Sequence, residues 1–109
     1  MNGKQFGKYI TRDGGCIHCG ETDAIAPHHR ANRGMGGSKA RDVPSNIIVI
    51  CSTMNTAMES DAAIAAMARE YGWKLRSYDD PGKTPVFYQT LGLWVVLNDK
   101  FGWDVIENT

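Results

Sequence analysis

Hydrophobic residues follow a helical spacing in the middle of the chain and a strand-like spacing on either side of it. The unbroken β-branched run at 47–50 predicts a buried strand. From about 52 to 71 the spacing is helical, and a break near 59–61 predicts two helices, the second capped by Ser60 or Asp61. Towards the C-terminus, apolar runs separated by turn residues predict short strands at about 86–88, 94–97 and 103–106.

The N-terminal part of the chain is more polar and has weaker periodicity. Residues 1–13 are predicted to form a basic arm with little structure. A short strand at 24–26 is expected to end at a pair of histidines, with Pro27 tolerated because the strand lies at a sheet edge. Residues 31–46 are rich in glycine and small polar side chains, so they predict a long loop. Loops of this length in compact domains usually carry function.

Length and composition predict one folded domain outside the membrane. The 109 residues suffice for a single core, and 42% hydrophobic with 22% charged residues is an ordinary globular composition. No apolar run approaches the roughly 20 residues that cross a bilayer, and the N-terminus lacks the apolar segment of a signal peptide. We therefore expect a cytoplasmic protein.

The charges of the chain are unevenly distributed, although the net charge is zero. Residues 1–41 carry seven Lys or Arg and three acids, a net of +4, and the remainder carries five bases and nine acids, a net of −4. A basic region can attract a polyanion even when the total charge cancels. The distribution is compatible with a nucleic-acid partner for the N-terminal part.

The adjacent histidines His28 and His29 are the strongest candidates for chemistry. Neighbouring residues on a strand point to opposite sides, so one imidazole can bind a metal while the other accepts a proton from water. Phosphodiester hydrolysis needs both functions: a divalent cation at the leaving oxygen and a base beside the attacking water. Asn55 and Glu59 lie four residues apart, on one face of the predicted helix, and can face His28. Asn46 is placed to hold the long loop through its side-chain amide.

With these residues in order, the chain resembles the HNH endonucleases, the ββα-metal finger nucleases. The resemblance rests on Pro27-His28-His29-Arg30, on the RGMGGS segment at 33–38, on 46–51 and on Asn55 with Glu59. It implies that His29 is the general base, that Asn46 is the central asparagine, and that His28, Asn55 and Glu59 are the metal ligands. Asn55 stands where the name of the family has its last histidine, which makes this an HNN variant. The small HNH proteins of bacteriophages are the most similar type.

This resemblance implies a fold and an activity for the whole chain. The expected domain is a treble-clef-like ββα-metal finger at 14–62, preceded by the arm at 1–13 and followed by a helix and a small antiparallel sheet at 63–109. The expected activity is metal-dependent hydrolysis of DNA phosphodiester bonds. The alternative is a catalytically weak or inactive module that binds nucleic acid or serves assembly and keeps the fold of the finger. By analogy, phage DNA-packaging or recombination proteins are the expected partners, in the host cytoplasm.

Two metal sites follow from these residues. The oxygen ligand of Asn55 favours Mg²⁺ or Mn²⁺ at the catalytic site, with Ni²⁺ or Zn²⁺ as alternatives. Many members of the family also hold a structural zinc between two CxxC knuckles. Cys16 and Cys19 form the first knuckle, and Cys51 begins the second, in which Met54 replaces the fourth cysteine. The three cysteines therefore either hold zinc or form a reduced, metal-free turn, and the His18 side chain is expected to point outward.

Basic side chains around the long loop are candidates for phosphate contacts, with ordinary solvation as the alternative for each. They are Arg30, Arg33, Lys39 and Arg41. The sequence alone leaves the oligomeric state and the DNA specificity open.

Overall fold

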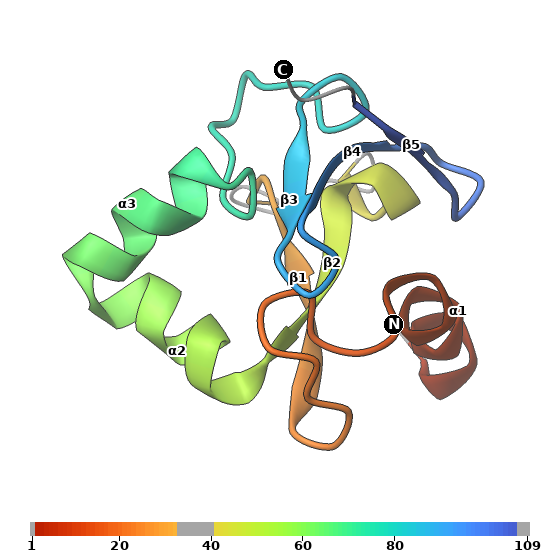
Figure 1. Cartoon of the computed structure of the whole chain (residues 1–109), viewed down its shortest axis with the longest axis horizontal. Coiled ribbons are helices and arrows are strands. Elements are labelled where there is room, and N and C mark those ends of the chain that lie inside the picture. Colours follow the sequence, from red (N-terminus) through yellow and green to blue (C-terminus); the bar gives the residue numbers. More distant parts are fainter. Residues whose placement is uncertain (1, 33–40, 107–109) are drawn as a thin grey trace.

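The computed structural model describes residues 2–32 and 41–106, and in these ranges helices and antiparallel strands form an α+β fold (Figure 1). The helices are α1 (Gly3–Asp13), α2 (Ser52–Ser60) and α3 (Ala62–Glu70), with a short 3₁₀ helix at Pro44–Asn46. The strands are β1 (Ile25–His29), β2 (Ile47–Cys51), β3 (Val86–Tyr88), β4 (Leu93–Leu97) and β5 (Trp103–Val105). The predicted α+β class is therefore confirmed. No helix in the described ranges has both the length and the apolar character needed to cross a membrane.

The strands form two small antiparallel sheets. One sheet is the β1–β2 hairpin, in which His28 lies opposite Ile48 and His29 lies opposite Ile47. The other has the order β3–β4–β5. The expected C-terminal strands are confirmed to within a residue at each end.

The break between α2 and α3 is confirmed, and its cap is Asp61. The Asp61 carboxylate accepts hydrogen bonds from the backbone amides of Ala63 at 2.9 Å and Ile64 at 3.3 Å. Such a side chain satisfies amides that have no partner within the first turn of a helix. The chain therefore stops one helix at Ser60 and starts the next at Ala62.

The prediction of a weakly structured N-terminal arm is wrong, because residues 3–13 form α1. Asn2 and Gln5 cap each other: the Asn2 side chain accepts from the Gln5 amide at 2.8 Å, and the Gln5 side chain accepts from the Asn2 amide at 3.3 Å. Gly14 ends the helix in the left-handed conformation. Both signals are local, so the sequence contained them, and the apolar Phe6, Tyr9 and Ile10 also have helical spacing.

A buried ion pair joins the end of α1 to the rest of the fold. Arg12 Nε lies 2.6 Å from Asp13 Oδ1, and both side chains are almost wholly buried. The Tyr88 hydroxyl donates to Asp13 Oδ1 at 2.5 Å, and the Val49 amide donates to Asp13 Oδ2 at 2.9 Å. Arg12 Nη1 also donates to the Pro44 carbonyl at 2.7 Å. These bonds fix α1 against both sheets.

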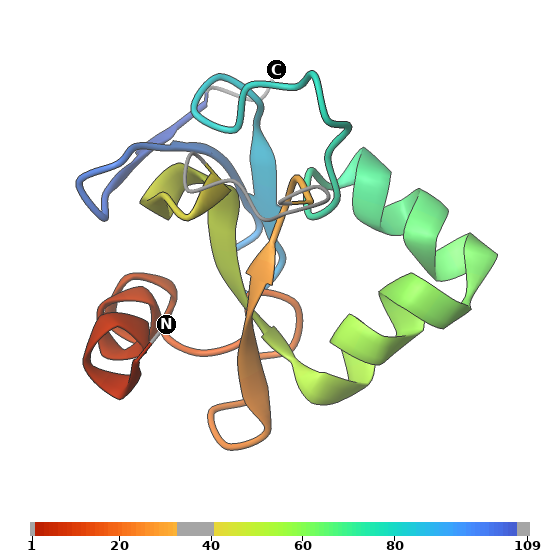
Figure 2. The same ribbon diagram turned by 180° about the vertical axis from the view of Figure 1, so that it is seen from behind.

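The β1–β2 hairpin separates two apolar clusters. On one face, Ile47 and Val49 of β2 pack against Tyr9 of α1. On the other face, Ile48 and Ile50 belong to the main core, to which α2, α3 and the second sheet contribute. The two views of the ribbon agree, with α1 on one side of the hairpin and α2 and α3 on the other (Figures 1 and 2). Any two neighbouring side chains on β1 therefore face different surroundings.

Candidate functional site

The histidine pair lies at the end of β1, and its two imidazoles belong to opposite faces of the hairpin. His29 shares the face of Ile47 and Val49, on which α1 packs. His28 shares the face of Ile48, which is covered by the main core. The strand alternation expected from the sequence thus separates the two rings.

His28 is held in one tautomer by the backbone. Its Nε2 lies 2.8 Å from the Trp73 carbonyl oxygen. A carbonyl only accepts, so Nε2 carries the proton and Nδ1 keeps a free lone pair in the neutral ring. The residue is 7% exposed, and burial lowers the pKa of His28. The neutral form, which can bind a metal, is thereby favoured.

The helix α2 brings Asn55 and Glu59 into the neighbourhood of His28. Asn55 and Glu59 are both near enough to His28 to raise its pKa, against the larger lowering effect of burial. Glu59 Oε1 also lies 3.2 Å from the ammonium nitrogen of Lys74. An imidazole, an amide and a carboxylate therefore lie in one region of the molecule, together with the ammonium of Lys74.

His29 is hydrogen-bonded to a carboxylate that the sequence analysis did not single out. Its Nε2 lies 2.7 Å from Asp42 Oδ1, and its side chain is 27% exposed. If Asp42 is ionised it can only accept, so Nε2 is again the protonated nitrogen and Nδ1 is the basic one. Asp42 lies 13 residues from His29 in the chain. No periodicity links residues so far apart across a loop, which explains why the sequence did not indicate this pair.

His29 also lines a cavity of about 630 Å³ on the face of α1. The walls come from α1, from β1, from the segment that precedes β2 and from the turn between β4 and β5. The lining residues are Gln5, Lys8, Tyr9, Pro27, His29, Asp42, Pro44, Asp99 and Phe101. The imidazole is thus open to solvent and to a ligand from this side.

Asn46 joins the two ends of the long loop, which is the geometry expected from the sequence. Its Oδ1 accepts from the Ala31 amide at 2.8 Å, and its Nδ2 donates to the carbonyls of Ala31 at 3.0 Å and Arg41 at 2.9 Å. The residue is fully buried. The clamp acts next to His29 and Asp42, so it limits how far the two can move apart.

The expected phosphate contact at Arg30 is incompatible with its surroundings. The residue is 1% exposed, and its guanidinium donates to backbone carbonyls through all of its nitrogens. These acceptors are Gly72 at 2.7 Å, Ser45 at 2.9 Å, Pro81 at 3.0 Å, Thr84 at 2.8 Å and Pro85 at 3.4 Å. Burial lowers the pKa of Arg30 to about 10, which still leaves it protonated at neutral pH. Arg30 therefore holds loops together and has no donor left for a phosphate.

The other basic residues of the loop have different positions. Arg41 is half-buried, and its guanidinium donates to the Ser77 carbonyl. Arg33 and Lys39 lie outside the described residues. The predicted cluster of phosphate-binding cations is thus reduced, within the described ranges, to Arg41.

Cys16, His18, Cys19 and Cys51 form a group whose ligand atoms lie within 4.8 Å of one another, and this group could hold a metal ion. The expectation that His18 points outward is wrong: its Nδ1 is buried and has no hydrogen-bond partner among the described residues. Backbone amides donate to two of the sulfurs, from His18 to Cys16 Sγ and from Met54 to Cys51 Sγ, both at 3.4 Å.

The surroundings of Cys19 in this group disturb the ionisation of its thiol. The backbone near Glu21 lowers the pKa of the Cys19 thiol, but burial and the neighbouring thiols of Cys16 and Cys51 outweigh it and raise that pKa to about 11. Three negative sulfurs cannot stay together without a compensating charge, and a cation supplies it. The donor set therefore fits a metal ion.

No protein-family model matches the chain, and comparison with curated proteins and with solved structures gives no match either. The assignment to the HNH nucleases, the DNA and phage partners and the cytoplasmic location therefore stay predictions. What the structure adds is the placement of the residues: His28 beside Asn55 and Glu59, and His29 beside Asp42.

Proposed function

We propose that the protein is a metal-dependent endonuclease of the HNH type that hydrolyses DNA phosphodiester bonds. The observation that carries this proposal is that the two histidines at the end of β1 lie on opposite faces of the hairpin. His28 has a lowered pKa and lies near Asn55 and Glu59 of α2, whereas His29 lines a cavity on the other face of the hairpin. The order of β1, β2 and α2 along the chain is that of a ββα-metal finger, which we include in the proposal.

In this proposal His28, Asn55 and Glu59 hold one divalent cation, Mg²⁺ or Mn²⁺. His28 would bind through Nδ1, because Nε2 donates to the Trp73 carbonyl, and metal-binding histidines commonly have such a partner on the other nitrogen. The cation supplies positive charge at the leaving oxygen of the phosphodiester. Glu59 would have to leave Lys74, to which it is bound at 3.2 Å. This exposed pair costs little to break.

His29 is the proposed general base. Its Nδ1 accepts the proton of the attacking water, and Asp42 holds the ring through Nε2. Asn46 keeps the loop, and with it Asp42, at a constant distance from β1. These residues orient the base before the substrate arrives.

Nicking of supercoiled plasmid DNA in Mg²⁺ or Mn²⁺ tests this function. We expect His29→Ala and His28→Ala each to lower the nicking rate by at least about 100-fold, since general-base catalysis contributes about 10²–10⁴-fold. Lys83→Ala, an exposed turn residue, serves as the control and should nick like the wild type. Equal nicking by the wild type and His29→Ala would exclude the proposed base.

A non-catalytic nucleic-acid-binding module is the second candidate. Lys74 favours it, because its ammonium is bound to Glu59, a predicted metal ligand. This candidate predicts DNA binding by the wild type with no nicking in any divalent cation, at any pH between 6 and 9.

We further propose that Cys16, His18, Cys19 and Cys51 hold a structural Zn²⁺, with His18 as the fourth ligand in place of the missing cysteine. Tetrahedral zinc with bonds of about 2.3 Å places sulfurs about 3.8 Å apart, within the 4.8 Å that spans the donor atoms. The site would fasten the segment before β1 to the start of α2, where Cys51 lies.

Metal analysis and Co²⁺ substitution test the zinc site. The wild type should contain one zinc per chain, and its Co²⁺ form should absorb in the visible range as a tetrahedral thiolate complex. His18→Ala should lose most of the metal, whereas Met54→Leu should retain it, because the proposal gives Met54 no role as a ligand. Retention of zinc by His18→Ala together with its loss in Met54→Leu would refute this ligand set.

A further inference from the structure

The direction from which a substrate reaches His29 is restricted by α1. The cavity beside the imidazole has a volume of about 630 Å³, within the range of about 300–1,000 Å³ typical of ligand pockets. Gln5, Lys8 and Tyr9 of α1 form one wall. A strand of nucleic acid that brings a phosphate to His29 from this side therefore passes along α1.

Phe101, which also lines the cavity, has an unusual backbone conformation. Phe101 has a φ of +60°, which is uncommon for a bulky residue. The Asn98 side chain imposes this turn by accepting from the amides of Lys100 at 2.8 Å and Gly102 at 3.1 Å. The Phe101 ring packs edge-on against Tyr9, with 4.9 Å between the ring centroids. This contact holds Phe101 against Tyr9 of α1.

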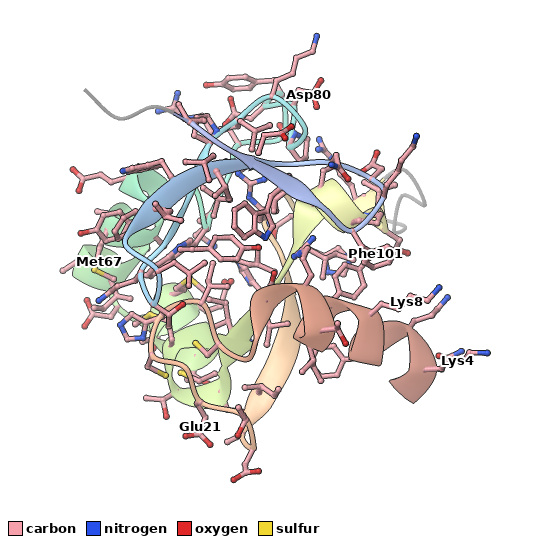
Figure 3. All side chains as sticks on the ribbon, turned by 45° about the vertical axis from the view of Figure 1, so that its right-hand side comes forward. Lys4, Lys8, Glu21, Met67, Asp80 and Phe101 are labelled. Carbon is pink, nitrogen blue, oxygen red and sulfur yellow. The ribbon has the colours of Figure 1, made fainter. Side chains whose placement is uncertain are left out.

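The exposed side of α1 is positively charged. Lys4 and Lys8 are four residues apart, so they lie on the same side of the helix, and both are exposed. Figure 3 shows their side chains extending outward from α1, with Phe101 close to Lys8. The only acidic residue of α1 is Asp13, which is buried against Arg12. Among the described residues neither ammonium has an ion-pair partner. Lys8 Nζ lies over the Phe101 ring, 5.6 Å from its centroid, and this contact leaves the positive charge of Lys8 without a counter-ion among those residues.

Two exposed carboxylates among the lining residues influence where a phosphate can lie. Asp42 binds His29, and Asp99 accepts from the Ser45 amide at 2.9 Å. Both carboxylates repel a phosphate, whereas Lys8, which lines the same cavity, attracts it. The charges thus favour a backbone that follows the lysines and reaches the cavity only at His29.

We propose that α1 is the DNA-binding surface of this protein, with Lys4 and Lys8 contacting backbone phosphates of the strand that is presented to His29. The proposal rests on the proposed nuclease function for the role of His29, but the surface itself can be tested by binding alone. It adds phosphate contacts on the N-terminal helix, whereas the predicted contact at Arg30 is excluded by burial.

The test compares two double variants with the same change of charge. Lys4→Gln/Lys8→Gln removes the proposed contacts, and Arg69→Gln/Lys83→Gln removes two exposed cations, on α3 and in the turn before β3. Binding of a fluorescent 20-base-pair DNA duplex is measured by anisotropy at 50–200 mM salt. We expect the first variant to bind at least about tenfold more weakly at low salt, with a salt slope smaller by about 2, and the second to bind like the wild type. Thermal melting checks that both variants are folded.

The possible outcomes separate this inference from the proposed function. If His29→Ala binds DNA like the wild type and Lys4→Gln/Lys8→Gln does not, the surface is supported whether or not the protein nicks DNA. If the wild type binds but never nicks, the nuclease proposal fails and the surface remains. If the two double variants bind equally, whether both weakly or both like the wild type, α1 is not the DNA-binding surface.

Discussion

The buried Arg12–Asp13 pair gives the sharpest test of how α1 is attached. Asp13→Ala removes four hydrogen bonds: two from Arg12, one from the Tyr88 hydroxyl and one from the Val49 amide. It also leaves the guanidinium of Arg12 buried, with a side chain 1% exposed and without its counter-ion. Burial alone would lower the pKa of Arg12, but the hydrogen bond and the charge of Asp13 outweigh it and raise that pKa.

The expected loss of stability follows from this unpaired charge. Removing one partner of a buried ion pair costs about 3–5 kcal/mol, a large part of the roughly 5–15 kcal/mol that stabilises a typical domain. For a domain of about 100 residues, 1 kcal/mol corresponds to roughly 4–8 °C in Tm, so Tm should fall by more than about 10 °C. Tyr88→Phe removes only one donor and should cost about 1–2 kcal/mol.

Urea unfolding followed by circular dichroism measures these differences. Asp104→Ala is the matched control, because Asp104 is exposed on β5 and should change stability by no more than about 0.5 kcal/mol. If Asp13→Ala were as stable as Asp104→Ala to within 1 kcal/mol, our description of α1 as fastened by a buried charge network would be wrong.

Three further predictions concern the loop, a glycine and the pH. Asn46→Ala loses three hydrogen bonds, so it should lower the free energy of unfolding by about 2–4 kcal/mol and slow nicking. Asn32→Ala, at an exposed position, should change neither. Urea unfolding and the plasmid assay measure the two effects. Gly72→Ala should destabilise the protein far more than Gly92→Ala. Both glycines have a positive φ, but of the two only a Cβ at Gly72 would collide with a backbone oxygen, that of Pro85. Similar urea midpoints for the two variants would contradict this. Because burial lowers the pKa of His28 below its unfolded value, the unfolded chain binds this proton first, and stability should fall as the pH drops below about 6.5, by at most about 1.4 kcal/mol per pH unit. Unfolding of wild type and His28→Gln at pH 8 and 5.5, without added divalent cations, should show this loss in the wild type alone.

Most elements of the fold could be predicted from the sequence because their signals are local. The β-branched run of β2, the cap at Asp61 and the short C-terminal strands each depend on residues close to one another in the chain. The same local signals exist for α1, in the Asn2–Gln5 capping pair and the apolar spacing. The prediction of a weakly structured arm was wrong because it followed the polar composition of this segment and not these signals. A helix with so few apolar residues is stable only because Tyr9 and the Arg12–Asp13 pair contact β2.

The candidate site was predictable only where spacing along one element determines geometry. The opposite directions of His28 and His29 and the shared face of Asn55 and Glu59 belong to this class. The roles of Arg30, His18 and Asp42 do not. Arg30 donates to carbonyls up to 55 residues away along the chain, His18 turns toward a cysteine 33 positions later, and Asp42 reaches His29 across the loop.

The sequence by itself determined which chemical groups are present and which of them alternate across a strand or share a helix face, because strand and helix periodicity are properties of the backbone. Only the tertiary structure decided which of those groups are exposed. Arg30 and Lys8 carry the same charge, but the first is surrounded by carbonyl oxygens of distant loops and the second is exposed and lines a cavity. That difference depends on how distant segments pack, and it places the proposed DNA-binding surface on α1.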